Sequence, residues 1–232
     1  MKINPQARQA LIAEIRNAET PHIVGYPHII ICGPSGSGKS TLIRAHDASL
    51  VKLKPSIFSP LVSGATRRPR PWEKHGEDYF FMTQADFGIA DFFETNEYTG
   101  NSKLYGTLES EIRRVVILEK KRMLLDIDPN GAMAFQEEFG NNVRDLFVVF
   151  LDTTIVELEK RLIRRLKKTP LELTVEERAE IDKRLLAAEK EKQLVESKRF
   201  IPNLRLPYDD ILVPEASNEI LFKAQNRMLQ MA

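Results

Sequence analysis

The sequence predicts an α/β fold, in which helices cover the faces of a parallel β-sheet. Short apolar segments typical of buried strands alternate with segments of helical spacing, and this alternation is the pattern of βαβ units. A glycine-rich loop at 33–40 separates the first predicted strand from the helix that follows it. The length of 232 residues suits one such domain with insertions.

The strand predictions follow the apolar runs of the sequence. The first is residues 28–32, HIIIC, a run of the kind found in the buried strands of parallel sheets. Further strands are expected at 58–63, 78–82, 122–127, 146–151 and 210–213. Because no helix is predicted between the segments 58–63 and 78–82, we expect these two strands to form a small antiparallel lobe.

The helix predictions rest on spacing and on capping residues. Residues 6–19 carry Leu11 and Ile15 at helical spacing, so 1–26 is expected to be an N-terminal helical extension. A helix from Lys39 to about Ala48 should follow the glycine-rich loop. Hydroxyl residues begin three more helices, at Thr83, Thr154 and Thr174, of which the last runs to about residue 199. The remaining expectations are a mobile connector at 167–173 and a final helix at 217–229.

Composition limits the classes of function. Hydrophobic residues make up 42% and charged residues 29%, as in ordinary globular proteins, and a net charge of +1 gives no case for nucleic acid or membrane as a partner. The single cysteine, Cys32, excludes an intrachain disulfide and is expected to be structural, and the four histidines form no HExxH pair. No signal peptide and no run of eighteen apolar residues is visible, so a cytoplasmic location is expected.

The glycine-rich loop predicts a nucleoside triphosphate site. Residues 33–40, GPSGSGKS, match the pattern G-x-x-x-x-G-K-[ST] at every fixed position. Glycines let successive backbone N–H groups wrap phosphate oxygens, and the following helix directs its positive end at them. Lys39 should reach the β- and γ-phosphates and Ser40 should hold Mg²⁺. The expected ATP-binding residues of this P-loop are Gly33, Pro34, Ser35, Gly36, Ser37, Gly38, Lys39, Ser40 and Thr41.

The P-loop makes the predicted sheet one of P-loop NTPase type, but the usual signatures of two NTPase classes are missing. The chain has no guanine-reading N-K-x-D and no L-S-G-G-Q, which disfavours a GTPase and an ABC-type ATPase. A phosphotransferase needs a second cationic site for its acceptor. Residues 63–79, SGATRRPRPWEKHGEDY, supply one candidate, because arginines offer rigid forks of donors and the adjacent prolines stiffen the backbone.

These motifs, in this order, resemble those of the guanylate kinase family from about residue 27 to residue 218. The resemblance rests on GPSGSGKST, SGATRRPRPWEKHGEDYFF, FFE…GN…YGT, LLDIDPNGA, VELEKRLIRR and IDKRLLAAEKE. It implies transfer of the γ-phosphoryl group of ATP to GMP, and to dGMP, in purine nucleotide metabolism, with Mg²⁺ as cofactor. It also implies a guanylate kinase-like domain at 27–232, with a core at 27–57, 108–153 and 200–232, a small mixed-β GMP-binding lobe at 58–107 and a helical lid at 154–199. A monomer or a homodimer is expected.

The resemblance assigns residues to GMP. Its phosphate would be held by Arg67, Arg70, Tyr79 and Tyr105, and guanine would be read by Ser63, Glu94 and Thr107, with Asp128 on the guanine side. The chemistry agrees, since a carboxylate accepts from both N1–H and the N2 amino group of guanine, whereas adenine offers neither. Two lost charge-assisted bonds correspond to discrimination of about 10²–10⁴.

The resemblance also assigns the catalytic and metal-binding residues. Asp126 would reach the Mg²⁺ shell together with Ser40, and Lys39, Arg161, Arg165 and Arg184 would be the catalytic cations. No general base is required, because the attacking phosphate oxygen of GMP is already anionic near neutral pH. Helix capping by Asp126 or Asp128, and a solvated helix face for the lid arginines, remain open as structural alternatives.

Two rival functions remain open at this point. One is an inactive protein-interaction module of the same fold, and the other is a kinase for a different nucleotide or a sugar phosphate. The sequence also departs from the family pattern. The GNSKLYG stretch and the lid between Arg165 and Arg184 are longer than usual, and Pro214 stands where the family tends to carry an asparagine near adenine.

Overall fold

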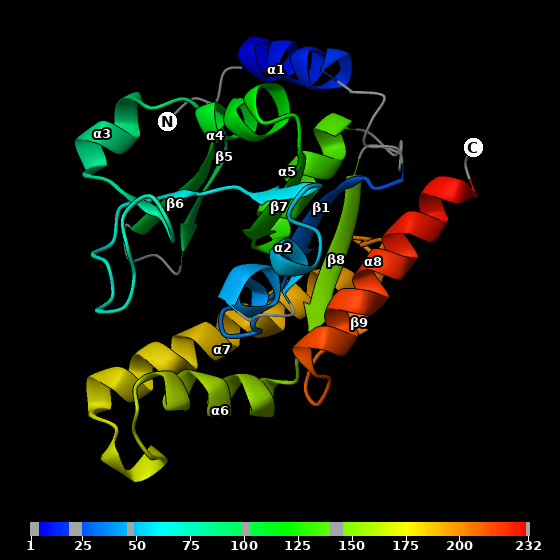
Figure 1. Cartoon of the computed structure of the whole chain (residues 1–232). Coiled ribbons are helices and arrows are strands. Elements are labelled where there is room, and N and C mark those ends of the chain that lie inside the picture. Colours follow the sequence, from blue (N-terminus) through cyan, green and yellow to red (C-terminus); the bar gives the residue numbers. More distant parts are fainter. Residues whose placement is uncertain (1–4, 19–24, 46–48, 99–102, 140–145, 231–232) are drawn as a thin grey trace.

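The computed structural model describes residues 5–18, 25–45, 49–98, 103–139 and 146–230 (Figure 1). Its α-helices are α1 (Pro5–Asn17), α2 (Leu50–Leu53), α3 (Gln84–Ile89), α4 (Glu109–Arg113), α5 (Pro129–Phe139), α6 (Ile155–Arg165), α7 (Val175–Glu196) and α8 (Val213–Leu229). Three shorter turns are the π-helical η1 (Thr41–Ala45) and η2 (Arg114–Leu118) and the 3₁₀ turn η3 (Pro170–Glu172). The Gly100–Asn101 pair of the sequence pattern lies outside the described residues.

A parallel five-stranded sheet forms the centre of the molecule, which confirms the predicted α/β class (Figure 1). Its strands, in spatial order, are β2 (Phe58–Pro60), β7 (Arg122–Ile127), β1 (His28–Cys32), β8 (Leu146–Asp152) and β9 (Leu204–Pro207). All five residues of β1 are buried. Because parallel strands end at the same edge, the P-loop after β1 and the aspartates at the end of β7 come together there.

Successive side chains of β1 point to opposite faces of this sheet and enter two different apolar clusters. Ile30 and Cys32 join the cluster that includes α1 and α5. Ile29 and Ile31 join the cluster that includes α8 and η1. Each fully buried aliphatic side chain contributes on the order of 1.5–3 kcal/mol, so the P-loop follows a strand that is well anchored in the core.

A second, four-stranded sheet is mixed and lies beside the first. Its order is β4 (Phe80–Phe81), β3 (Gly64–Ala65), β6 (Lys103–Leu108) and β5 (Phe92–Tyr98). Strands β3 and β4 are parallel, whereas β3–β6 and β5–β6 are antiparallel. The predicted antiparallel pairing of 58–63 with 78–82 is therefore wrong, because Phe58 and its neighbours join the central sheet beside β7.

One strand prediction fails, and several observed strands were not predicted, for local reasons. Residues 210–213 do not form a strand, since α8 begins at Val213, with Pro214 in its first turn, where a missing N–H leaves no bond unmade. The edge strand is β9, whose single buried residue, Leu206, gave a weak apolar signal. Strands β5 and β6 were not predicted, because polar residues and Gly106 interrupt their apolar pattern.

The helix predictions hold better than the strand predictions. Thr83, Thr154 and Thr174 cap α3, α6 and α7 by accepting the N–H of the third helical residue. Helix α7 ends at Glu196, three residues before the predicted end, and α8 begins four residues before the predicted start. The helix after the P-loop begins at Lys39 and continues as η1 to Ala45, while 46–48 lie outside the described residues.

Helices α6 and α7 form a hairpin below the central sheet (Figure 1). Leu162 and Ile163 of α6 meet Ile181 of α7 in a small apolar cluster of their own. The connecting stretch at 167–173 contains η3, which starts at a capping box between Thr169 and Glu172. Within the part of the chain that the structure describes, no helix is long and apolar enough to cross a bilayer.

Candidate active site

A cavity of ≈ 1050 Å³ opens where the two sheets and the helical hairpin meet. Ligand pockets usually measure about 300–1,000 Å³, so this one has room for two nucleotides. Its walls come from the P-loop, the end of β7, the four-stranded sheet, and helices α6 and α7. The cavity therefore gathers residues from segments that lie far apart in the sequence.

The P-loop has the conformation that its glycines predict. Gly33, Gly36 and Gly38 have φ angles of 145°, 92° and 100°, which residues with a side chain rarely adopt. A Cβ atom on Gly38 would also lie 2.9 Å from the ring of Tyr208. Within this loop Lys39 Nζ donates to the carbonyl oxygens of Gly33, at 2.6 Å, and Pro34, at 3.0 Å. Lys39 is thus held at the loop by neutral partners that a phosphate can replace.

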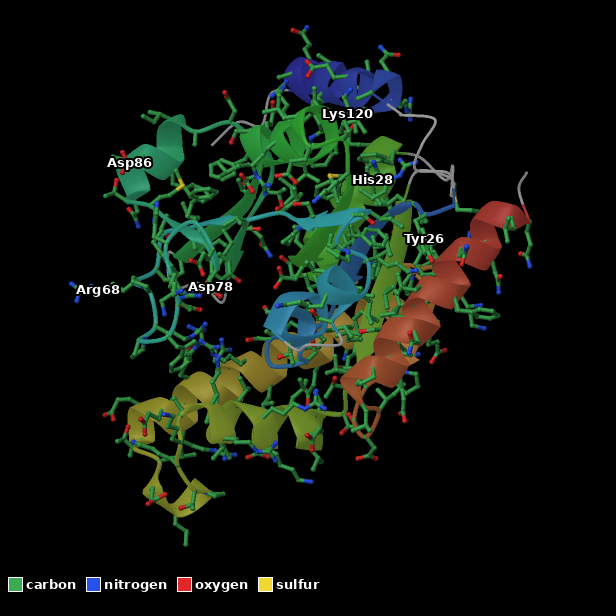
Figure 2. The ribbon with its side chains drawn as sticks, in the orientation of Figure 1. Tyr26, His28, Arg68, Asp78, Asp86 and Lys120 are labelled. Atoms are coloured by element: carbon green, nitrogen blue, oxygen red, sulfur yellow. The ribbon has the colours of Figure 1, made fainter. Side chains whose placement is uncertain are left out.

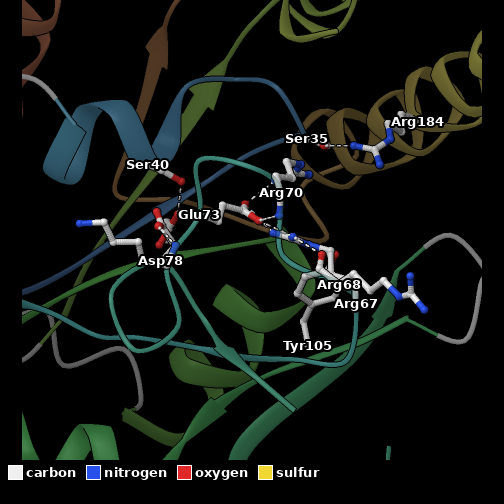
Figure 3. A network of polar contacts seen from close by, with 11 residues as sticks. Ser35, Ser40, Arg67, Arg68, Arg70, Glu73, Asp78, Tyr105 and Arg184 are labelled. Atoms are coloured by element: carbon white, nitrogen blue, oxygen red, sulfur yellow. Dashed lines mark hydrogen bonds and ion pairs between the residues drawn. The ribbon is translucent and has the colours of Figure 1, made fainter. Parts of the chain in front are cut away.

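Ser40 and Asp126 meet at the edge of the central sheet. Ser40 Oγ donates to Asp126 Oδ2 at 2.7 Å, which links the start of the P-loop helix to the end of β7 (Figure 3). The described residues contain no group of three histidine, cysteine or acidic side chains that could hold a metal ion. A hydroxyl beside one carboxylate still fits Mg²⁺, because that ion is usually bound by one or two carboxylates together with substrate phosphates and water.

Two of the predicted lid arginines join the hairpin to the P-loop. Arg161 donates to the carbonyl oxygens of Ser37, Tyr208 and Asp209 at 2.8, 2.7 and 3.0 Å. Arg184 of α7 donates to Ser35 Oγ at 3.3 Å (Figure 3). Both arginines line the cavity, so the hairpin presents its cations to the space above the P-loop.

Arg165 is the predicted lid arginine that faces the acceptor side. It is exposed to the cavity, yet the surrounding protein and the like charges of Arg70 and Arg184 lower its pKa to about 10. At neutral pH it remains a cation. These three arginines repel one another, and a multiply charged phosphate group bound between them would reduce that repulsion.

The acceptor arginines are organised by Glu73, a residue that the sequence reasoning missed. The Glu73 carboxylate accepts two hydrogen bonds from the Arg67 guanidinium, at 2.5 and 2.7 Å, and one from Arg70 Nη1, at 2.6 Å (Figure 3). Burial opposes its ionisation, but the hydrogen bonds from Arg67 and from the Arg70 backbone prevail and lower the pKa of Glu73 to about 2. The signal that could have found it is its spacing three residues after Arg70.

The neighbours of these arginines match the resemblance. Arg67 Nε donates to the hydroxyl of Tyr105 at 3.1 Å, and its guanidinium lies 4.9 Å from the ring centroid of Tyr79. Arg68, in contrast, is exposed and points outward at the edge of the molecule (Figure 2). The structure therefore brings Arg67, Arg70, Tyr79 and Tyr105 together and leaves Arg68 outside.

Glu94 lies on β5 and is 5% exposed, so it is not the surface carboxylate that a helix–loop junction would carry. Thr107 donates to its Oε1 from the backbone N–H, at 2.9 Å, and from the hydroxyl, at 2.8 Å. Burial and the charge of Asp128 raise the pKa of Glu94 to about 7 against these hydrogen bonds. Glu94 lines the cavity.

Thr107 is 1% exposed and does not line the cavity. It can act on a ligand only by orienting Glu94. Ser63 does line the cavity, as does Asp128. Asp128 also caps α5, because its Oδ1 accepts from the backbone N–H groups of Asn130, at 2.8 Å, and Gly131, at 3.2 Å.

Gly131 allows Glu94 to approach α5 closely. A Cβ atom at this position would lie 2.3 Å from Ile127 Cδ1 and 3.1 Å from Glu94 Oε2. Only glycine leaves this space open, so the LLDIDPNGA segment shapes the part of the cavity beside Glu94 as well as the part beside Asp126.

A second buried carboxylate, Glu191, was also missed. It lies on α7 seven residues after Arg184, which is two helical turns, and so shares a face with that arginine. Glu191 is 8% exposed, lines the cavity, and its Oε2 has no hydrogen-bond partner among the described residues. Burial, opposed by Lys39 and assisted by Asp128, raises its pKa to about 7.

The far end of the cavity, beyond the P-loop, is largely apolar. Tyr208, Ile211, Leu212, Val213 and Pro214 line it. Pro214 contributes no side-chain hydrogen bond, so an adenine placed here would meet apolar surface and backbone groups at this position.

The family model and the curated relatives agree on one family. A family model described as "Guanylate kinase" matches residues 26–206. The guanylate kinase of Sus scrofa is 34% identical over 145 residues, which cover 61% of this chain and 68% of that protein. The guanylate kinase of Thermotoga maritima is 36% identical over 140 residues, covering 59% of this chain and 62% of that protein. A crystal structure of guanylate kinase from Anaplasma phagocytophilum has the same fold, with a TM-score of 0.55 at 18% identity over 90% of this chain and 86% of that one.

Proposed function

Because the chain belongs to the guanylate kinase family, we propose that it transfers the γ-phosphoryl group of ATP to GMP within the cavity described above. The observation that carries the proposal is the position of Glu94. This buried carboxylate lines the same cavity as the P-loop and as the Arg67–Arg70 cluster. A cavity with two phosphate-binding cradles and one guanine-reading carboxylate fits ATP and GMP together.

The donor site uses backbone groups and few side chains. The N–H groups of the P-loop and the start of its helix receive the phosphates of ATP, and Lys39 exchanges its loop carbonyls for phosphate oxygens. Mg²⁺ would be held by Ser40 and by Asp126, in part through water, and it would neutralise charge on the triphosphate. The apolar end of the cavity beside Pro214 receives the adenine ring.

The acceptor site uses side chains alone. Arg67, Arg70 and the tyrosines Tyr79 and Tyr105 hold the phosphate of GMP, which displaces Glu73 from the arginines. Glu94, oriented by Thr107, accepts from guanine N1–H and from the N2 amino group, while Ser63 and Asp128 complete the guanine side. Glu94 must be ionised to accept both hydrogen bonds.

The transfer needs positioning and positive charge more than acid–base chemistry. An anionic oxygen of GMP attacks the γ-phosphorus, the bond from that phosphorus to the β–γ bridging oxygen breaks, and ADP leaves with the electron pair. Lys39, Arg165 and Arg184 converge where the equatorial oxygens carry the developing charge. Closure of the four-stranded lobe and of the α6–α7 lid excludes water, so that GMP receives the phosphoryl group.

A coupled assay with ATP as donor and GMP, dGMP, AMP, UMP and CMP as acceptors tests the proposal. GMP and dGMP should be phosphorylated, with GMP exceeding AMP by about 10²–10⁴ in kcat/KM. Turnover of GMP no greater than that of AMP would overturn the specificity assignment. The rival interaction module predicts no ATP binding in a calorimetric titration, and the intact P-loop, with Lys39 and Ser40 in place, argues against it.

A further inference from the structure

The N-terminal helix α1 lies outside the matched region 26–206, yet it packs against the acceptor side of the molecule. Leu11, Ile12 and Ile15 are buried in the cluster that includes α5 and the central sheet. Glu14 of α1 pairs with Arg113 of α4 at 3.0 Å. Helix α1 is therefore attached to the rest of the chain by its apolar face and by polar contacts.

Arg8 is the residue of α1 that connects it to the guanine side. Its Nη1 donates to Glu138 Oε1 of α5 at 2.8 Å, and its Cζ lies 5.1 Å from the ring centroid of Phe93 on β5. The side chain is 15% exposed, and its buried Nε has no hydrogen-bond partner among the described residues. Arg8 thus joins α5 to β5, the two elements whose contact shapes the guanine side.

A register shift in β5 brings Glu94 close to the contact between β5 and α5. Successive residues of a regular strand point to opposite faces, but the register shifts between Phe92 and Glu94. The Phe93 ring stacks on Phe135 of α5, with 4.1 Å between ring centroids. Glu94 Oε2 lies 3.1 Å from the position of a Cβ atom on Gly131, one helical turn before Phe135. Phe93 and Glu94 therefore both face α5.

The charges around Glu94 give Arg8 an electrostatic role as well. Burial and the charge of Asp128, at the start of α5, raise the pKa of Glu94, whereas the hydrogen bonds from Thr107 and, after them, the charge of Arg8 of α1 lower it. The charged group that faces Arg8 itself is Glu138 of α5. A partly buried cation near a buried carboxylate is weakly screened by salt, so its effect on the carboxylate persists in buffer.

We propose that Arg8 is a positioning residue for GMP recognition, which holds β5 against α5 and keeps Glu94 in the ionised state that guanine requires. The proposal rests on the proposed function, since it assumes that Glu94 reads guanine. It makes α1 a part of the acceptor site rather than an appendage of the kinase fold. Arg8 touches no substrate in this arrangement and acts through Phe93 and Glu94.

The test uses the full chain with the substitutions Arg8→Met and Arg8→Lys. The control is Glu14→Gln, which removes the ion pair between α1 and Arg113 and leaves Arg8 in place. Calorimetric titrations measure the Kd values of GMP and of IMP, which lacks the N2 amino group, between pH 6 and pH 9. Arg8→Met should weaken GMP binding several-fold near pH 7 and move upward the pH below which GMP binding is lost.

Several results distinguish this role from a structural one. Arg8→Lys should restore most of the pH profile, the ratio of IMP to GMP Kd should fall in Arg8→Met, and Glu14→Gln should resemble the wild type. The ionisation of the GMP phosphate is common to all variants and cancels in the comparison. If Arg8→Met does not fold, Arg8→Gln carries the same test, because it keeps a donor for Glu138 and removes the charge.

An unchanged pH profile and an unchanged IMP-to-GMP ratio in the uncharged variant would overturn the proposal. Equal losses in GMP and ATP binding, not restored by lysine, would also overturn it and would make Arg8 a purely structural residue. If the wild type binds GMP in this pH-dependent way but transfers no phosphoryl group, the proposed function fails and the role of Arg8 is still measured. A wild type that binds no GMP overturns both.

Discussion

The donor and acceptor sides of the cavity are built on opposite principles. The phosphate-binding part of the donor side is one contiguous segment, residues 33–41, whose glycines have the required φ angles. The acceptor side takes Arg67, Glu94 and Asp128 from separate segments, with α1 behind them. A backbone cradle depends mainly on local sequence, whereas a side-chain cradle depends on the tertiary fold that assembles it.

The two sides also differ in how their charges are paired. Lys39 rests on two neutral carbonyl groups of its own loop. The acceptor arginines share Glu73, which has a pKa of about 2, while Glu94 forms no ion pair with the described residues and has a pKa of about 7. Under the proposed function, specificity for the acceptor depends on a carboxylate whose ionised form is disfavoured by burial.

The largest expected effect is on the donor side. Lys39→Ala removes the one side-chain cation that reaches the transferring phosphates from the P-loop, and kcat should fall by on the order of 10³. The loss in stability should be small, because the side chain contributes two hydrogen bonds to carbonyl oxygens of its own loop. Steady-state kinetics and thermal unfolding check this pair of results. Retained turnover would remove the P-loop lysine from the mechanism.

The next effect separates the two sides by substrate. Glu94→Gln keeps the shape of the side chain but places an amide where guanine needs two acceptors, so kcat/KM for GMP should fall by about 10²–10³. The KM for ATP should stay near its wild-type value, because Glu94 lies on the acceptor side of the cavity. Kinetics with GMP, AMP and ATP measure this separation, and equal losses with every acceptor would assign Glu94 a structural role only.

The smallest effect concerns stability and pH in the nucleotide-free protein. Glu94 and Glu191 have pKa values of about 7 in the fold, above the ordinary value of 4.5. Their contribution to the free energy of unfolding is therefore complete below pH 4.5 and is lost as the pH rises through 7, by on the order of 3 kcal/mol each. Glu73, with its lowered pKa, acts in the opposite sense and loses its contribution as the pH falls from 4.5 toward 2.

Urea denaturation at pH 5 and pH 8 measures this contrast. The wild type should be less stable at pH 8 than at pH 5, and Glu191→Gln should remove part of the difference by raising stability at pH 8. The exposed Glu137→Gln on α5 is the matched control and should leave the difference unchanged. Parallel curves for wild type and Glu191→Gln would show that burial does not penalise the charge of this glutamate.

The sequence predicted the two sides unequally. The spacing of Gly33, Lys39 and Ser40 is enough to identify the P-loop, because this local pattern by itself predicts phosphate binding. Glu94 gave no such signal, since its strand β5 is interrupted by polar residues and by a register shift, and only the resemblance to a family pointed to it. Glu73 and Glu191 were missed because their significance depends on which cations and which buried surfaces the fold places beside them.

The ion pairs of Glu73 have a consequence for how GMP arrives. Since Arg67 and Arg70 already hold a carboxylate, the incoming phosphate exchanges one anion for another and does not add a charge to an open cationic patch. The long-range attraction that Arg67 and Arg70 exert on anions is therefore reduced. A ligand therefore replaces the Glu73 carboxylate only if it offers the arginines more oxygens and carries a base that fits the site.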